Sequence, residues 1–270
     1  MKIYAIVENN KKETSIGYLF YYEKSKEFYI ELLDGLEEWD VPLLLSTLYR
    51  KGERTINSYW SKVWVQQRIV PSDRQNIGQI LRDNKLNMYD EYLLLMLAKG
   101  RCEQDDFYLI PTTVDALPSQ IIKRFNYRVE NVMTLNNFSL LVTFRNGKVK
   151  KCNLNKYFII NKGFRIVYKN SQIFNYVRIV EGGYGVCWDE FLSISNMELY
   201  DMGKDVSITS DNLNKFVAEN VLTTYEVMNL LNCSRQYVNE LVKNQKLHPI
   251  KSYERITLFL KSEVEKLNWV

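Results

Sequence analysis

The sequence predicts an α+β protein of several domains, and three observations support this class. Apolar and polar residues alternate between polar turns over the first 60 residues, which is typical of strands. Asn-Gly and Gly-Gly pairs separate short apolar runs between residues 126 and 203, as in β-hairpins. After residue 221, apolar residues recur at helical spacing. We therefore expect a mixed N-terminal domain (residues 1–118), a small strand-rich α+β module (119–206) and a C-terminal domain built on a helix pair (207–270).

The composition is that of a globular chain with ample core residues. The 270 residues are 46% apolar and 25% charged, and this length allows two or three domains. The net charge is +4 and the isoelectric point is about 8.6. Because this charge is only mildly basic, any contact with nucleic acid is expected to be local.

The cysteines and the single histidine, His248, argue against metal chemistry. Four cysteines lie far apart and form no CxxC pair: Cys102, Cys152, Cys187 and Cys233. Neither a structural zinc site nor another cofactor is expected, and reduced thiols suit a cytoplasmic protein. No apolar run approaches the roughly 20 residues that cross a bilayer, so no membrane partner is expected. The first residues do not resemble a signal peptide.

Strands and then helices are expected along the N-terminal domain. The expected strands cover residues 3–7, 16–22 and 27–33. Residues 41–48 suit either a short helix or a buried strand, because periodicity does not separate the two. Helices are expected over residues 73–82, capped by Ser72, and over residues 89–98, ended by Gly100.

The order of these elements resembles the N-terminal domain of HipA-type proteins. A small β unit is followed by Arg68, Pro71 and Arg74 ahead of paired helices. The kinase machinery of HipA lies in another domain, and nothing in this chain matches it. The resemblance therefore implies a fold and no phosphoryl transfer.

Two features near the end of this domain have plain structural interpretations. Glu103, Asp105 and Asp106 form an acidic patch, which we expect to be a solvated loop because no further ligand completes a metal-binding motif. Residues 111–118 are interpreted as a linker, or as a loop that leads into a short helix over residues 119–124.

The middle module is expected to consist of hairpins and short helices. Its expected strands cover residues 129–135, 139–144, 148–153, 177–181 and 184–188. Asn146-Gly147 predicts a type I′ turn because both residues tolerate positive φ, and Gly182-Gly183 predicts a second hairpin turn. Residues 170–176 suit a helix or a turn, and residues 194–200 suit a closing helix.

This module resembles a small bacterial family of unknown function, some of whose members precede a helix-turn-helix domain. The resemblance is carried by residues 139–144, Asn146-Gly147, Leu154, Phe174, Val177, Gly182-Gly183, Trp188 and Glu198-Leu199-Tyr200. Many members have Asp at the positions of Asn146 and Ser193, so any role of those carboxylates is absent here. The family implies a binding or pairing module, often encoded beside small toxin-like proteins, and no reaction.

The C-terminal residues predict two short helices joined by a tight turn at Asn232-Cys233. Thr223 and Glu226 fit a capping box at the start of the first helix, and Ser234 suits the N-cap of the second. The apolar residues expected to face the core are Val227, Leu230, Leu231, Val238, Leu241 and Val242. The side chains left on the outer face of the second helix are Arg235, Gln236, Asn239 and Lys243.

This segment resembles the winged helix-turn-helix domains of the excisionase and MerR-like families. The matching parts are residues 222–231, Ser234, Arg235, Val238, a basic hairpin (the wing) over residues 249–259 and a closing helix that begins with residues 261–264. The wing departs from these families because residues 251–255 contain no Gly, which leaves its turn geometry open.

The resemblance implies double-stranded DNA as the partner, and the geometry of the motif assigns roles. The predicted DNA-binding residues are Ser234, Arg235, Gln236, Asn239, Lys243, Lys251, Tyr253 and Arg255. Arg235 and Gln236 would reach base edges, where Arg prefers guanine and Gln adenine, with Asn239 one turn further on. The two lysines and Arg255 would bind phosphates, and the tyrosine would pack on a sugar.

We therefore expect a sequence-specific DNA-binding protein, either a transcriptional regulator or an antitoxin-like autorepressor. Residues 221–261 carry six cations and three anions, a local charge of +3, which suits several phosphate contacts and a homodimer on paired half-sites. A protein partner would bind through residues 1–206. The alternative is a protein-interaction adaptor whose helix-turn-helix contacts protein.

The sequence contains no catalytic constellation, and we do not expect an enzyme. Any Cys-His or Ser-His-Asp site would need His248, which precedes Pro249 at the start of the wing. There the histidine suits a turn residue or a phosphate contact. Gly182-Gly183-x-Gly185 lacks the strand-to-helix context of a phosphate loop. An enzyme would need a deep pocket with carboxylates converging near Asp105.

Overall fold

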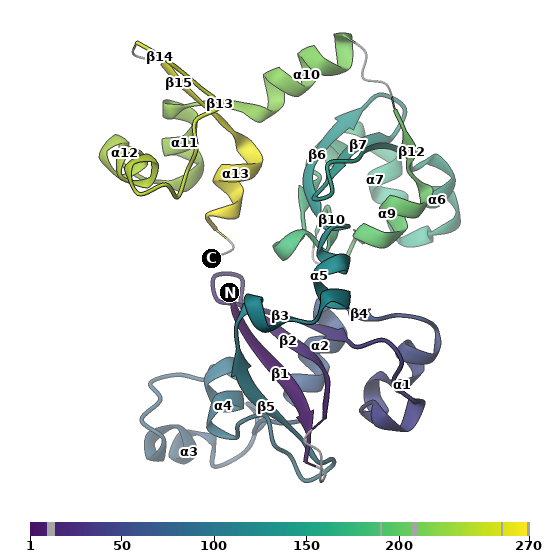
Figure 1. Ribbon diagram of the computed structural model, residues 1–270, viewed down its shortest axis with the longest axis vertical. Coiled ribbons are helices and arrows are strands. Elements are labelled where there is room, and N and C mark those ends of the chain that lie inside the picture. Colours follow the sequence, from purple (N-terminus) through teal and green to yellow (C-terminus); the bar gives the residue numbers. More distant parts are fainter. Residues whose placement is uncertain (10–13, 190, 207–209, 255, 269–270) are drawn as a thin grey trace. The chain divides into compact units, whose positions relative to one another are not determined.

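The computed structural model describes residues 1–9, 14–189, 191–206, 210–254 and 256–268, and it shows a mixed α+β chain with several antiparallel sheets (Figure 1). The chain divides into two compact units, Met1–Lys123 and Arg124–Val270. The finer division into three domains, with boundaries at residues 118 and 206, stays a prediction.

The first unit is built on a five-stranded antiparallel sheet with the order β4-β3-β2-β1-β5. Its strands are β1 (Lys2–Glu8), β2 (Ser15–Tyr22), β3 (Glu27–Leu32), β4 (Thr55–Ile56) and β5 (Phe107–Thr112). The three strands expected near the N-terminus are confirmed. The linker expected over residues 111–118 is wrong at its start, because Pro111 and Thr112 belong to β5. β5 is an edge strand, and an edge tolerates the missing N–H of proline.

The helices that accompany this sheet are α1 (Leu43–Arg50), α2 (Ser58–Gln66), α3 (Ile77–Asp83) and α4 (Glu91–Leu97). Helix α5 (Ser119–Phe125) spans the boundary between the two units in the sequence. By sequence, residues 41–48 suit either a short helix or a buried strand, and the structure shows a helix there, α1. The expected start of α3 is wrong. The chain still turns at Arg74, whose N–H donates to Pro71 O at 3.2 Å, and Asn76 rather than Ser72 precedes the helix.

The caps of α4 explain where this helix begins and ends. The Asp90 side chain accepts a hydrogen bond from Leu93 N at 3.0 Å, so the helix starts one residue after Asp90. Gly100 has a φ of +70°, and its N–H donates to Leu95 O at 2.9 Å. The expected glycine stop is therefore confirmed.

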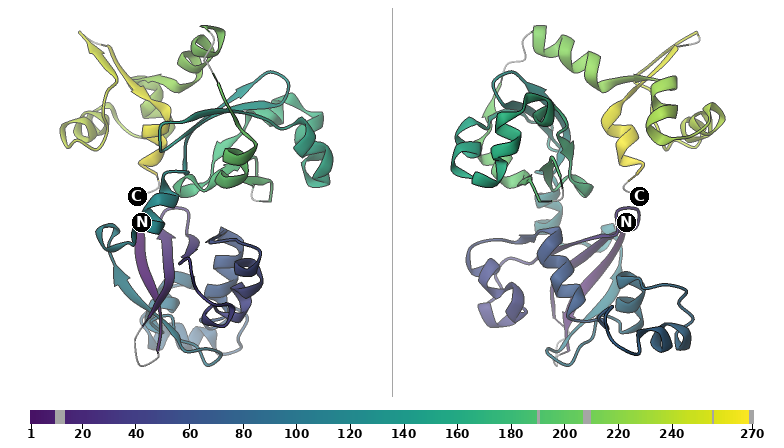
Figure 2. Two further views of the ribbon diagram at one scale, coloured as in Figure 1. Left: turned by 45° about the vertical axis from the view of Figure 1, so that its right-hand side comes forward. Right: turned by 180° about the vertical axis from the view of Figure 1, so that it is seen from behind.

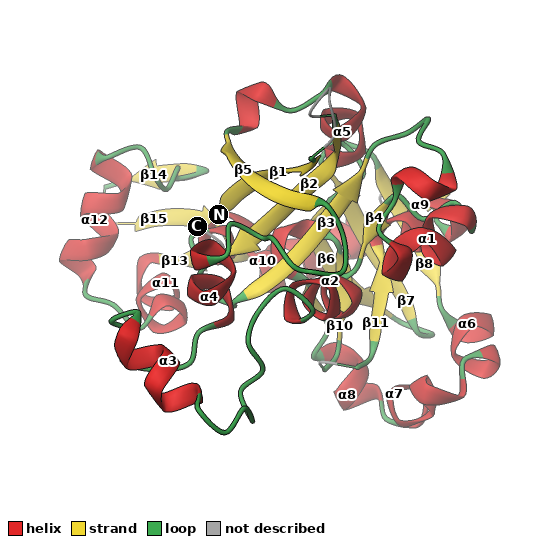
Figure 3. Cartoon of the chain, turned by 90° about the horizontal axis from the view of Figure 1, so that it is seen from below, coloured by secondary structure: helices red, strands yellow, loops and turns green. Residues whose placement is uncertain are grey.

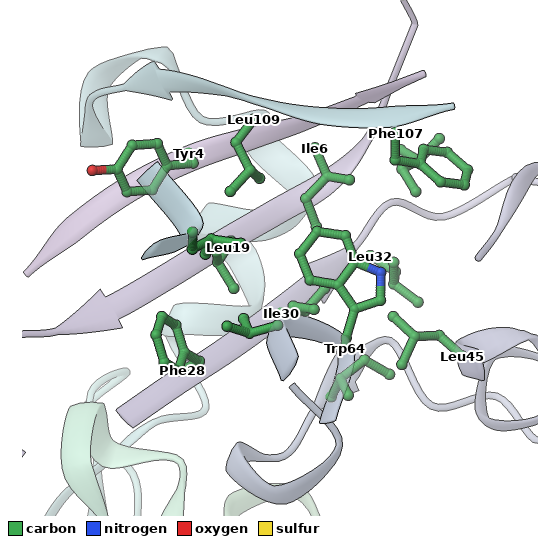
Figure 4. Close-up of a cluster of buried hydrophobic side chains, with 14 of the residues drawn as sticks. Tyr4, Ile6, Leu19, Phe28, Ile30, Leu32, Leu45, Trp64, Phe107 and Leu109 are labelled. Carbon is green, nitrogen blue, oxygen red and sulfur yellow. The ribbon is translucent and has the colours of Figure 1, made fainter. Parts of the chain in front are cut away.

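A core of large apolar side chains lies between this sheet and its helices. Trp64 of α2 is fully buried, and Figure 4 shows its indole in one cluster with Ile6, Leu32 and Leu45. These residues come from strands and helices that are distant in sequence. Their burial therefore ties the sheet to α1 and α2.

A buried ion pair corrects the interpretation of the acidic patch. The Arg68 side chain is fully buried, lies 3.6 Å from the centre of the Trp64 ring and binds the Asp105 carboxylate. Asp105 is therefore a structural counter-ion and not a solvated loop residue, whereas Glu103 and Asp106 are exposed as expected. Burial lowers the pKa of Arg68, and the charge of Asp105 acts in the opposite direction.

The first part of the second unit contains two small antiparallel sheets. The four-stranded sheet has the order β12-β8-β7-β6, with β6 (Val129–Leu135), β7 (Ser139–Phe144), β8 (Val149–Asn153) and β12 (Lys204–Asp205). The three-stranded sheet has the order β11-β10-β9, with β9 (Arg178–Ile179), β10 (Gly185–Cys187) and β11 (Ser193–Ser195). The hairpins expected in this region are confirmed.

Two details of these hairpins differ from expectation. Gly147 has a φ of +80°, but Asn146 does not take positive φ, so the turn is not type I′. The closing helix, α9 (Asn196–Met202), begins at Asn196 because the three residues before it pair with β10 as strand β11. Ser195 and Glu198 then form a capping box at its start.

Three short helices, α6 (Asn155–Ile160), α7 (Arg165–Lys169) and α8 (Ser171–Asn175), lie side by side against these sheets (Figure 3). A 3₁₀ turn, η3 (Lys162–Phe164), joins α6 to α7. Residues 170–176, left open between helix and turn, thus contain a helix. Phe158 of α6 lies 5.3–6.4 Å from six rings, and together they form the aromatic cluster: Phe138, Tyr157, Phe158, Phe164, Tyr168, Phe174 and Trp188.

Cys152 of β8 belongs to the same core. Its thiol is fully buried and donates a hydrogen bond to Leu199 O at 3.2 Å. Burial raises the pKa of Cys152 to about 12. The thiol is therefore protonated at neutral pH.

The rest of the second unit consists of α10 (Ser210–Asn220), β13 (Val221–Thr223), α11 (Thr224–Leu231), α12 (Arg235–Lys243), β14 (Lys251–Tyr253), β15 (Ile256–Leu260) and α13 (Lys261–Lys266). The three strands form an antiparallel sheet with the order β13-β15-β14. The β14–β15 hairpin extends from the helix pair as a two-stranded arm (Figure 2). Helix α10 was not expected, and its Phe216 packs against Met133, Leu135 and Leu141.

Candidate nucleic-acid interface

The start of α11 has the predicted capping box. The Thr223 hydroxyl accepts a hydrogen bond from Glu226 N at 3.4 Å, and the Glu226 carboxylate accepts from Thr223 N at 2.7 Å. The Thr223 hydroxyl also donates to this carboxylate at 2.7 Å. The two hydrogen bonds that the carboxylate accepts lower the pKa of Glu226, and the one from Thr223 N has the larger effect.

Thr223→Ala is expected to destabilise the second unit by about 1 kcal/mol, because α11 loses its N-cap. The pKa of Glu226 is lower in the folded chain than its ordinary value of 4.5. The ionised carboxylate therefore stabilises the fold fully above pH 4.5, and this stabilisation is lost as the pH falls through the lowered pKa of the folded chain. Thermal melts of variant and wild type should therefore differ most at about pH 7. The difference should narrow in acid, where the hydroxyl still accepts from Glu226 N but no longer donates to an ionised carboxylate. Thr47→Ala, an exposed threonine, is the control.

The turn between α11 and α12 depends on one left-handed residue. Asn232 has φ 48° and ψ 51°, a conformation that Asn adopts more readily than most residues. Cys233 N then donates to Met228 O at 3.0 Å, and the Ser234 hydroxyl accepts from Tyr237 N at 3.2 Å. Ser234 is thus the N-cap of α12, as predicted from the sequence.

The inner faces of the two helices share one small core with the hairpin and α13. Its buried members are Val227, Val238, Leu241, Leu247, Phe259 and Val264. Leu231 and Val242 are half-buried at its margin. The prediction for Leu230 is wrong: its side chain is 40% exposed. Phe259 and Val264 fill the space beside Val227, so the core does not extend as far as Leu230.

The outer face of α12 is polar and open. The predicted side chains Arg235, Gln236, Asn239 and Lys243 are all exposed. None of them makes a hydrogen bond or an ion pair with another residue in the described part of the chain. This face therefore presents donors and acceptors that a ligand could satisfy.

The hairpin also presents its predicted residues to solvent. Lys251 and Tyr253 of β14 are exposed, Tyr253 by 67%. The turn of this hairpin contains no glycine, and Glu254 adopts the positive φ (47°) that glycine would otherwise supply. Arg255 lies outside the described residues.

His248 precedes the hairpin and has a protein partner. Its backbone N–H donates to the Glu263 carboxylate at 2.9 Å, and its ring Nδ1 lies 2.7 Å from the same oxygen. The ring is 68% exposed. This contact ties the start of the hairpin to α13, which fits the turn-residue interpretation better than a phosphate contact.

Two exposed aromatic residues of the helix pair were not among the sequence predictions. Tyr225 of α11 is 69% exposed and Tyr237 of α12 is 49% exposed. Both lie in the first turn of their helices and off the apolar face. An aromatic residue placed outside the helical apolar stripe is the sequence signal that could have identified them.

An open cleft is found among the described residues, but no cluster of metal ligands and no membrane-spanning helix. The described residues contain no group of three or more His, Cys, Asp or Glu side chains that could hold a metal ion. An open cleft of about 660 Å³ is lined by Tyr176, Arg178, Trp188, Asp189 and Phe191, a set without a nucleophile–base pair. Within the described ranges, no helix has the length and apolar character needed to cross a membrane.

Comparison with known proteins adds no family assignment. No protein-family model, no curated protein and no solved structure matches this chain.

Proposed function

We propose that this chain is a sequence-specific DNA-binding protein that acts through a winged helix-turn-helix. In this proposal α11 and α12 are the helix-turn-helix, α12 is the recognition helix, and the β14–β15 hairpin is the wing. The observation that carries it is the open polar face of α12, with Arg235, Gln236 and Asn239 exposed and unpaired among the described residues. An α-helix of this kind fits the major groove.

The contacts sort into base readout and phosphate binding. Arg235 and Gln236 lie at the start of α12, and this end of a recognition helix reaches base edges. Lys243 lies at the other end of α12, and Lys251 lies on the wing, where cations bind phosphates. The local charge of +3 over residues 221–261 suits modest affinity for each copy, and paired half-sites would supply the rest.

Regulation of transcription, or autorepression of an antitoxin-like kind, is the role that such binding would serve in the cytoplasm. In this proposal the chain catalyses no reaction, and residues 1–206 receive any protein partner. Selection of bound fragments from genomic DNA separates the regulator from the autorepressor. An autorepressor binds the promoter of its own gene, so that promoter is among the selected fragments, whereas for a regulator of other genes it is absent.

A second candidate is a protein-interaction adaptor whose helix pair contacts protein. The exposed apolar side chains around the helix pair, Tyr225, Leu230 and Ile256, favour it. Titration of binding to random duplex DNA against salt separates the two functions. A steep fall in log affinity with log salt supports DNA binding, and absence of binding at low salt supports the adaptor.

Arg235→Ala is expected to weaken binding to a selected operator by about 1–3 kcal/mol and to relax the sequence preference at one base pair. The reason is loss of a bidentate contact with a base edge. Fluorescence anisotropy with operator and with scrambled duplex measures both effects.

Lys251→Ala is the matched control, because it removes one cation from the wing and no base contact. It should weaken both duplexes about equally and reduce the salt slope by about one. If Arg235→Ala also weakened both duplexes equally, Arg235 would be a phosphate contact and the assignment of base readout would be wrong.

A further inference from the structure

A cation-rich surface lies in the second unit outside the proposed DNA interface. Residues 131–180 carry nine cations and no acidic side chain. Four of these cations lie on α6, η3 and α7: Lys156, Lys162, Arg165 and Lys169. All four are exposed, and none has an ion pair, hydrogen bond or cation–π contact with the residues that the structure describes.

Three exposed isoleucines lie among these cations. Ile159, Ile160 and Ile166 are exposed by 64%, 76% and 58%. They point outward because Phe158 and Phe164 of the same segment are buried in the aromatic cluster. We call the four cations and three isoleucines the isoleucine face. Isoleucine neither stacks on bases nor hydrogen-bonds to them, so this face suits a protein rather than a nucleic acid.

The complementary composition occurs in the first unit. Residues 34–43 carry four anions and no cation: Asp34, Glu37, Glu38 and Asp40. Between and beside them Trp39 is 79% exposed and Leu43 is 90% exposed. We call residues 34–43 the acidic tryptophan segment. Tryptophan is among the residues that contribute most at protein interfaces, and a ring this exposed is available to a partner.

Two anions of this segment form ion pairs at the surface. Glu38 pairs with Arg50 at 3.5 Å and Asp34 pairs with Arg54 at 3.4 Å, and both carboxylates are about half exposed or more. Such exposed ion pairs contribute little to stability. The carboxylates can therefore exchange these partners for the unpaired cations of another molecule.

We propose that the acidic tryptophan segment of one copy docks on the isoleucine face of a second copy, and that two such contacts close a symmetric dimer. Trp39 and Leu43 cover the isoleucines, and the carboxylates face the four cations. The first unit has sixteen cations and eighteen anions (net −2), and the second has twenty and fourteen (net +6). Unlike units therefore attract, whereas two second units repel. This contact does not depend on DNA.

A charge-swap experiment tests the contact directly. The triple variant Asp34→Lys/Glu37→Lys/Glu38→Lys changes the net charge of the segment from −4 to +2. The triple variant Lys156→Glu/Lys162→Glu/Arg165→Glu changes that of the face from +4 to −2, and all six side chains are exposed. Each variant alone should dimerise at least about tenfold more weakly than wild type, because like charges meet in both contacts. An equimolar mixture should recover dimerisation, since each reversed surface then meets its complement. Sedimentation velocity over a concentration series, without DNA, measures the dimer dissociation constant of each variant and of the mixture.

The controls separate docking from unfolding and from unspecific charge effects. Lys204→Glu changes an exposed cation of β12 that is outside the isoleucine face, and it should leave dimerisation unchanged. Trp39→Ala should weaken dimerisation at least about tenfold with an unchanged melting curve. A wild-type chain that is monomeric at every concentration overturns the proposal. Dimerisation of both reversed variants at wild-type strength, or a mixture of them that stays monomeric, also overturns it.

Discussion

Asp105→Ala is expected to lower the free energy of unfolding of the first unit by about 3–5 kcal/mol, because it leaves the Arg68 guanidinium buried without its counter-ion. The Arg68 side chain has no exposed surface. Its Nε has no hydrogen-bond acceptor within the described residues, and Nη1 donates only to Trp64 O, at 3.2 Å. The guanidinium therefore depends on Asp105 more than a surface arginine depends on its partner.

Urea unfolding followed by tryptophan fluorescence measures this effect, because Trp39, Trp60 and Trp64 all lie in the first unit. Asp106→Ala is the matched control: this neighbouring carboxylate is exposed, and its loss should change stability by less than about 0.5 kcal/mol. The double variant Arg68→Met/Asp105→Leu should recover most of the loss, since an apolar pair leaves no charge to solvate. A single variant as stable as wild type would show that Asp105 is not required.

Phe158→Ala is expected to destabilise the second unit by about 3–5 kcal/mol, the cost of removing a buried phenyl ring and leaving a cavity. Phe158 is 2% exposed and lies at the centre of the aromatic cluster. Its ring is stacked on that of Phe164, with a centroid distance of 5.3 Å and an interplanar angle of 15°. The transition of the second unit in urea should move to lower concentration while that of the first stays in place.

Ile159→Ala is the natural comparison, because it is the next residue along α6 and is 64% exposed. It should leave the unfolding transition nearly unchanged and still weaken dimerisation, if the isoleucine face binds a second copy. Phe158→Leu should lose less than Phe158→Ala, since leucine fills part of the cavity. Equal stability losses at residues 158 and 159 would contradict the assignment of inward and outward faces.

Local sequence signals predicted most of the second unit and the first three strands of the first. The capping box at Thr223 and Glu226 is present as predicted, because each of its hydrogen bonds depends on residues three apart. The Asn232 turn and the Ser234 cap were predictable for the same reason. The exposure of Arg235 follows from helical periodicity alone.

Two of the errors depend on residues that are distant in sequence. Asp105 is bound by a residue 37 positions away, and no local pattern reveals that partner. Leu230 has the spacing of a core residue, yet Phe259 and Val264 already fill the core beside Val227. The wing turn shows a third limit, because Glu254 adopts a conformation that the sequence pattern assigns to glycine. The roles of the α12 side chains on DNA stay predictions.

The buried thiol of Cys152 is a natural probe of local unfolding in the second unit. A thiol-specific reagent needs both access and a thiolate, and the folded chain withholds both at this position. Cys152 can therefore react only from molecules whose β8 strand has come apart from α9. Its modification rate, timed by mass spectrometry after replacement of the three more exposed cysteines, converts directly into the population of opened molecules, with no dye or engineered label.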